Sequence, residues 1–127
     1  MQDIWVVTEV VGGGLAPVSL QLLGKARQLA DQAGGQVIAV AMGHLMMPLA
    51  QEIVEYGADE VLVADDPELA SYRTLPYARL LTQLVQKGKP NVVLLGATSQ
   101  GRDLAPRVAA RLETGLTADC LDLSINK

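Results

Sequence analysis

Apolar residues alternate along the chain between two spacings: short uninterrupted runs, and longer stretches in which they recur every three or four positions. The uninterrupted runs have no polar side to turn toward water, so they predict strands buried on both faces of a sheet. The longer stretches have the period of an amphipathic helix. Strands are predicted at residues 4–10, 36–42, 60–64 and 92–95, with a fifth beginning near Leu121. Helices are predicted at residues 18–33, 45–56, 75–86 and from Asp103 to Gly115, with a brief helical turn at 67–72.

Proline and glycine mark where these helices begin and end. Pro17 precedes the first helical stretch, where its missing N–H costs little, and Gly34 follows the last apolar position. Asp103 is expected to cap the last helix, with Pro106 still inside the first turn and Gly115 ending the helix. This helix has an apolar stripe on one face and arginines on another. The stripe consists of Leu104, Ala105, Val108, Ala109 and Leu112, and the arginines are Arg107 and Arg111.

Strands that alternate with helices along the whole chain predict an α/β fold with a mostly parallel sheet. The expected architecture is a three-layer α/β/α sandwich of the adenine-nucleotide-hydrolase-like type, formed as one domain by residues 1–127. The stretch from residue 92 to residue 123 reads strand, loop, helix, strand. It is therefore interpreted as one right-handed crossover unit of the parallel sheet.

The charge balance and the cysteine count exclude several classes of function. The chain has 14 acidic and 10 basic residues, and its net charge of −4 argues against a nucleic-acid surface, which needs clustered basic residues. Cys120 is the only cysteine, so the sequence offers no internal disulfide and no thiolate set for a metal. No apolar run reaches the ~20 residues that span a bilayer, and the chain begins directly with a strand. These features predict a cytoplasmic protein without membrane insertion.

The isolated polar residues near strand ends do not form a catalytic set. His44 follows a strand and is interpreted as an ordinary loop histidine, and Asp65 and Asp66 are interpreted as caps of the turn before a proline. Glu9 is unusual because it is a charged residue in an apolar strand. We expect it at the carboxyl end of that strand, where it faces a ligand site or an interface. No catalytic residue and no metal ligand is therefore predicted.

Three segments of the chain together resemble one known family. The run LLGATSQGRDLAPRVAARLETGLTADC, at residues 94–120, is similar to the signature of the electron transfer flavoprotein alpha subunit in its N-terminal domain. The opening IWVVTEV and the middle segment EYGADEVLVADD also resemble that family. The resemblance covers essentially the whole chain and implies the strand order 3-2-1-4-5.

The resemblance also implies a function, because electron transfer flavoproteins are heterodimers that carry electrons. They pass electrons from acyl-CoA or other dehydrogenases to a membrane quinone reductase or another acceptor. In this family the redox FAD is held mainly by the C-terminal domain of the alpha subunit, and the beta subunit binds AMP or a second FAD. The resemblance therefore implies a scaffold domain that packs against the beta subunit and is not itself an enzyme.

The sequence stops at Lys127, soon after the TGLTADC motif. We therefore expect the C-terminal FAD domain to be absent, so that the chain is either a piece of a longer alpha subunit or a split relative. FAD is expected in the full assembly and not tightly bound to this chain. The flavin-contacting residues of the family would lie beyond Lys127.

The implied strand order places one candidate binding site between the first and fourth strands, where the order reverses. The loops at residues 11–16 and 97–102 would face each other there. The candidate residues are Gly96 and Gly101, which allow close approach of a ligand, Thr98, and Arg102, whose guanidinium suits phosphate or carboxylate. Alternatively, the loops only turn tightly and Arg102 pairs with Asp103 or with a partner subunit.

Two other classes of function are also considered. One is a stand-alone AMP- or ATP-binding module of the universal-stress type, although Pro17 stands where a dinucleotide motif starting at Gly12 needs glycine. The other is a purely structural assembly domain that binds a beta-like subunit and no ligand.

Overall fold

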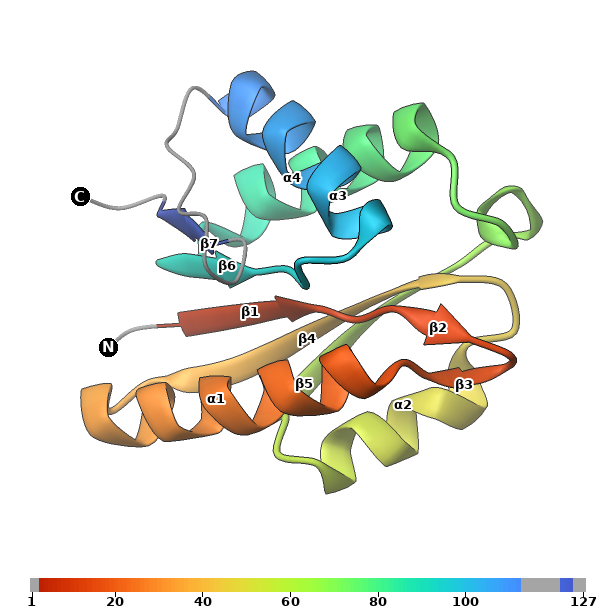
Figure 1. Cartoon of the computed structure of the whole chain (residues 1–127). Coiled ribbons are helices and arrows are strands. Elements are labelled where there is room, and N and C mark those ends of the chain that lie inside the picture. Colours follow the sequence, from red (N-terminus) through yellow and green to blue (C-terminus); the bar gives the residue numbers. More distant parts are fainter. Residues whose placement is uncertain (1–2, 113–121, 125–127) are drawn as a thin grey trace.

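A five-stranded sheet runs through the centre of the structure, with helices on both faces (Figure 1). The computed structural model describes residues 3–112 and 122–124. The strands of this sheet are β1 (Asp3–Val7), β4 (Gln36–Gly43), β5 (Glu60–Asp65), β6 (Val92–Leu94) and β7 (Asp122–Ser124). The helices are α1 (Pro17–Ala33), α2 (Met47–Glu55), α3 (Thr74–Gly88) and α4 (Ser99–Leu112), with a 3₁₀ turn, η1 (Pro67–Leu69).

The strand order is β5-β4-β1-β6-β7, which is the order 3-2-1-4-5 in sequence. Strand β1 pairs in parallel with β4 and β6, and β4 pairs in parallel with β5. These pairings confirm the predicted mostly parallel α/β sandwich.

The last strand corrects one prediction. Strand β7 runs antiparallel to β6, with Asp122 opposite Leu94 and Ser124 opposite Val92, so residues 92–123 are not a parallel crossover unit. The apolar pattern could not reveal this, because alternation along a strand is the same in either direction. A parallel and an antiparallel partner therefore look alike in sequence.

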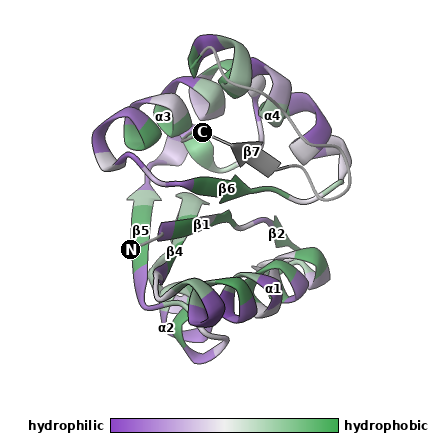
Figure 2. Cartoon of the chain, turned by 90° about the vertical axis from the view of Figure 1, so that its left-hand side faces the viewer, coloured by the Kyte–Doolittle hydropathy of each residue, from purple (hydrophilic) through white to green (hydrophobic). Residues whose placement is uncertain are grey.

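The sheet separates two hydrophobic cores, as Figure 2 shows by the apolar residues between its layers. Along β1, Trp5 and Val7 belong to the core beneath α3 and α4, whereas Ile4 and Val6 belong to the core beneath α1 and α2. All four side chains are buried. The alternation confirms that this apolar run is a strand covered on both faces.

The helix boundaries agree with the sequence at α1 and differ at α4. Pro17 is the first residue of α1, and Gly34 ends it with φ +71°, a left-handed conformation that glycine adopts without strain. Helix α4 begins at Ser99, four residues before Asp103, so Asp103 is not its cap. Pro106 therefore lies inside the helix, where its ring removes one backbone hydrogen bond. The predicted end at Gly115 lies outside the described residues.

A small hairpin replaces the end of the first predicted strand. Strands β2 (Val10–Val11) and β3 (Gly14–Leu15) pair antiparallel, and the turn between them is formed by Gly12 and Gly13. Both glycines have positive φ, 60° and 82°, as a two-residue type I′ turn requires. The hairpin lies at the end of the sheet where β1 and β4 finish (Figure 1). Within the described residues, no helix is long and apolar enough to cross a membrane.

Candidate binding site at the carboxyl edge of the sheet

A cavity of about 240 Å³ lies at the carboxyl edge of the sheet, beyond the ends of β1 and β4. In an open α/β sheet this edge is where ligands bind, at the point where the strand order reverses. The walls come from the ends of β1 and β4, the β2–β3 hairpin, the segment between β5 and α3, and the first turn of α4. The polar lining side chains include Thr8, Glu9, His44, Tyr72 and Gln100.

Glu9 links the two loops that the sequence places at this edge. Its side chain is buried, and its Oε2 accepts a hydrogen bond of 2.7 Å from the Thr98 hydroxyl. The backbone of Glu9 is held by Ser19, whose Oγ accepts from the Glu9 N–H at 2.7 Å, and by the Ala16 N–H, which donates to the Glu9 carbonyl at 2.9 Å. Glu9 therefore sits just beyond β1 and faces the cavity, as expected from the sequence.

Thr98 takes the capping role that the sequence analysis assigned to Asp103. The Thr98 hydroxyl accepts a hydrogen bond of 3.0 Å from the Gly101 N–H and donates its own proton to Glu9. The Thr98 carbonyl accepts from the Arg102 N–H at 2.8 Å. The first turn of α4 is thus closed by the chain itself, and the cap is joined to a carboxylate.

The four predicted binding residues lie beside the cavity without lining it. A Cβ on Gly96 would lie 2.8 Å from Val18 Cγ2 and 3.3 Å from Glu9 Oε2, so glycine is needed there for packing. Gly101 is buried in α4. Arg102 is exposed, and its Nε donates to the Ala97 carbonyl at 3.3 Å. Binding of a cofactor by Gly96, Thr98, Gly101 and Arg102 stays a prediction.

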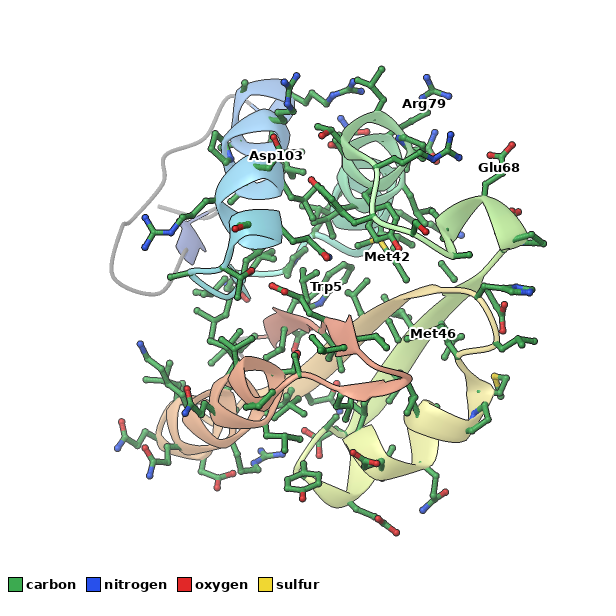
Figure 3. The ribbon with its side chains drawn as sticks, turned by 45° about the vertical axis from the view of Figure 1, so that its right-hand side comes forward. Trp5, Met42, Met46, Glu68, Arg79 and Asp103 are labelled. Atoms are coloured by element: carbon green, nitrogen blue, oxygen red, sulfur yellow. The ribbon has the colours of Figure 1, made fainter. Side chains whose placement is uncertain are left out.

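Arg102 does not pair with Asp103, because Asp103 is occupied by other residues. The Asp103 carboxylate on α4 (Figure 3) accepts hydrogen bonds from the Thr74 hydroxyl and from the Tyr72 hydroxyl, the latter at 2.7 Å. These two bonds, that of Thr74 first, hold the pKa of Asp103 below its usual value. Burial, together with the bond to Asp103, raises the pKa of Tyr72 to about 12. Sequence reasoning did not find this cluster, because its members are about 30 residues apart.

Two adjacent aspartates, Asp65 as the last residue of β5 and Asp66 just after it, cap different segments. Asp66 accepts a hydrogen bond of 2.8 Å from the Glu68 N–H, which confirms its predicted role in the turn, and the Glu68 side chain points outward (Figure 3). Asp65 instead accepts from the N–H groups of Leu45 and Met46, at 2.8 and 3.0 Å. These two bonds lower the pKa of Asp65. His44 Nδ1 lies 3.5 Å from Asp65 Oδ1, at the wall of the cavity.

The charges of the cavity lining do not suit an anion. Glu9 contributes a carboxylate, and the lining contains no lysine or arginine among the described residues. The N–H of Gly101 at the start of α4 is already bonded to Thr98, so this donor is not free for a phosphate. The cavity therefore favours a hydrogen-bond donor or a cation.

We expect replacement of Arg102 by alanine to leave the fold nearly unchanged. Its side chain is exposed and makes one long hydrogen bond, so the free energy of unfolding should change by less than ~0.5 kcal/mol. Thermal unfolding of Arg102→Ala, beside the exposed control Arg111→Ala on the same helix, measures this. A clearly larger loss for Arg102→Ala alone would show that the guanidinium is a structural element of the loop.

Comparison with known proteins shows the family. The model of the electron transfer flavoprotein domain matches residues 4–127. The chain is 50% identical over 125 residues to the electron transfer flavoprotein subunit alpha of Megasphaera elsdenii, covering 98% of this chain and 37% of that protein. It is 48% identical over 128 residues to the acryloyl-CoA reductase electron transfer subunit beta of Anaerotignum propionicum, covering 99% and 35%. It is 46% identical over 126 residues to the lactate dehydrogenase (NAD(+),ferredoxin) subunit LctC of Acetobacterium woodii, covering 99% and 30%.

Solved structures with a similar fold are universal stress proteins. The structure from Archaeoglobus fulgidus has a TM-score of 0.57 at 13% identity, covering 87% of each chain. A universal stress protein in complex with cAMP has a TM-score of 0.57 at 18% identity, covering 87% of this chain and 89% of that one. At such low identity the likeness concerns the fold alone.

The sequence relatives are much longer proteins. The chain spans between 30% and 37% of the length of the three relatives described above. Its own length is nonetheless matched almost completely by the family model and by each relative. The chain therefore belongs to the electron transfer flavoprotein family and corresponds to the N-terminal domain of the alpha subunit.

Proposed function

We propose that this domain is the scaffold part of a two-subunit electron carrier and that it packs against an electron transfer flavoprotein beta subunit. The observation that carries this proposal is the identity of 46–50% to electron transfer subunits over 98–99% of the chain. The role assigned to this chain is to support electron transfer and not to catalyse a reaction.

The names of the relatives indicate the kind of enzyme that such a carrier serves. One relative is a subunit of an acryloyl-CoA reductase, and another is a subunit of a lactate dehydrogenase. We propose that the assembly takes electrons from an acyl-CoA dehydrogenase or another dehydrogenase and delivers them to a quinone reductase or a comparable acceptor. We also propose that the assembly transfers electrons in the cytoplasm and that this domain does not insert into a membrane.

The redox cofactor of the assembly is proposed to be FAD, held outside this domain. The cavity of about 240 Å³ is smaller than the ~300–1,000 Å³ typical of sites for drug-sized ligands, and FAD is larger than most of these. Its wall carries the Glu9 carboxylate, which would repel the FAD pyrophosphate, and among the described residues neither lysine nor arginine lines it. This cavity therefore does not fit FAD, and we propose that AMP is bound by the partner subunit.

We expect the purified chain to be colourless and to form a stable 1:1 complex with the beta subunit encoded by the same genome. Absorbance near 450 nm measures bound flavin, and size-exclusion chromatography with light scattering measures the complex. A flavin content near one per chain would contradict the placement of FAD outside this domain. Failure of the complex to form would contradict the scaffold role.

A titration with AMP, ATP and FAD, followed by calorimetry, separates the proposal from the alternatives. Micromolar binding of AMP or ATP to the chain alone would favour a nucleotide-binding module of the universal-stress type. Absence of nucleotide binding together with a stable complex supports the scaffold.

A further inference from the structure

Glu9 is a buried carboxylate whose charge is not paired within the described part of the chain. Its side chain is 9% exposed, and its Oε2 is bonded to the Thr98 hydroxyl. Among the described residues, no hydrogen bond reaches the other oxygen, Oε1, and no lysine or arginine forms an ion pair with Glu9. Oε1 is not fully enclosed, so it is reached from the cavity, where a cation could take the place of water beside it. The Glu9 carboxylate therefore lacks a cationic partner.

The surroundings of Glu9 leave room for that partner. Glu9 lines the cavity of about 240 Å³ together with Met42, Met46 and Tyr77, whose side chains are largely apolar. His44 also lines it, but its Nδ1 is directed to Asp65 at 3.5 Å. The cavity thus combines one negative charge, a lining that is more polar than apolar and space for a group of side-chain size.

Exposed apolar side chains occur on two of the segments that line the cavity. Val11, Leu45 and Met47, which we name the apolar rim, are 66%, 71% and 65% exposed. Each is the chain neighbour of a residue that lines the cavity. Apolar contacts around a buried, charged anchor are the arrangement found at the centres of protein interfaces, where they exclude water from the anchor.

Leu45 is held in its exposed position against its own conformational preference. Its φ of +60° lies in the left-handed region, which is unfavourable for leucine. Asp65 accepts hydrogen bonds from the N–H groups of Leu45 and Met46 and so keeps the segment in this shape. The isolated domain gains little apolar burial from Leu45, which is 71% exposed, so a role in contacting another molecule accounts for the arrangement better than a role in folding.

We infer that this edge of the sheet is a docking surface for the beta subunit, in which an arginine or lysine side chain of that subunit enters the cavity and pairs with Glu9 while the apolar rim packs around it. The inference rests on the proposed function and specifies where the two subunits meet. Charge complementarity selects the occupant, because a cation satisfies the free Oε1 and an anion is repelled by it. The planar guanidinium of arginine fits best, since it donates two parallel hydrogen bonds to a carboxylate.

The charge of Glu9 is tested by Glu9→Gln. Glutamine keeps the size of the side chain and an oxygen to accept from Thr98, so the fold should persist while the charge is lost. We expect affinity for the beta subunit, measured by calorimetry, to fall by at least about 30-fold, the effect of losing one member of a buried charge pair. The matched control is Glu55→Gln, an exposed carboxylate on α2, which should change the affinity by less than about threefold.

The apolar rim is tested by Leu45→Gly. Glycine adopts a φ of +60° without strain, so the melting temperature of the chain should stay the same or rise. The affinity for the beta subunit should instead fall about five- to tenfold, because an exposed contact is removed. A residue with only a structural role would not change stability and affinity in opposite directions.

Each outcome decides the inference. Unchanged affinity of Glu9→Gln overturns it and leaves the proposed function intact, whereas absence of any complex with the natural chain contradicts the proposed function itself. In that second case the chain is titrated with agmatine, a small guanidinium compound, and followed by NMR. Shifts at Thr8, Glu9 and Gly12 that vanish in Glu9→Gln would replace the docking surface by a small-cation site. No shifts would remove the cavity as a cation site altogether.

Discussion

The variant Leu94→Ala is expected to lower the free energy of unfolding by about 2–5 kcal/mol, the cost of deleting most of a buried leucine side chain. Leu94 lies on β6, next to the central strand β1, and only 1% of its side chain is exposed. It belongs to the core formed with α1, where neighbours such as Leu22 and Leu23 are also buried. The neighbouring strands hold the backbone in place, so the vacated volume cannot collapse.

Urea unfolding followed by circular dichroism measures this loss. The matched control is Leu75→Ala on α3, where 56% of the leucine is exposed, and its stability should change by less than about 1 kcal/mol. A loss of less than about 1 kcal/mol for Leu94→Ala would mean that β6 is not a packed interior strand.

The variant Gly88→Ala sets two effects of opposite sign against each other. Alanine in a helix is favoured over glycine by up to about 1 kcal/mol, so the substitution at the end of α3 should stabilise the helix. However, the new Cβ would lie 2.3 Å from Cζ2 and 2.7 Å from Cη2 of Trp5, a buried ring that would have to shift from its packed position. Overpacking of a core costs typically 1–3 kcal/mol, and more for a severe clash. We expect the clash to prevail, with a net loss of about 1–3 kcal/mol.

Trp5 is the only tryptophan of the chain, so its fluorescence reports both the unfolding transition and any change in its surroundings. Gly24→Ala is the matched control, because a Cβ on Gly24 of α1 would meet no atom within 4 Å. That variant should gain about 0.5–1 kcal/mol from helix propensity alone. Stabilisation of Gly88→Ala to the same extent would show that Trp5 does not pack against Gly88 at the end of α3.

Local chemistry in the sequence was sufficient to predict most of the secondary structure. Pro17 and Gly34 bound α1 in the structure as they do in the sequence pattern, because proline and glycine restrict or permit particular backbone angles whatever their surroundings. The buried strands followed from uninterrupted apolar runs, as at Val93 and Leu94 of β6, which are both buried. The family resemblance supplied the strand order, which the residues alone did not determine.

The errors occurred where two local choices were equally good. Both Thr98 and Asp103 are residues that cap helices, and only the position of Glu9 beside Thr98 decides between them, since Thr98 donates to that carboxylate. Asp103 instead accepts hydrogen bonds from Tyr72 and Thr74, which lie on a segment far away in the sequence. Ligand binding by the four candidate residues Gly96, Thr98, Gly101 and Arg102 stays a prediction, and none of them lines the cavity at the carboxyl edge.

The sequence by itself determined the class of fold and the family, because periodicity, proline and glycine positions and long motifs are local properties of the chain, and the family in turn implied the strand order and its switch point. Only the tertiary structure decided the direction of β7, the cap of α4 and the pairing of Glu9 with Thr98. It also showed the cavity and the strained, exposed Leu45. These features depend on which residues from distant parts of the sequence come into contact when the sheet assembles, and on which charges are buried as a result. The spacing of residues along the chain does not determine either of these.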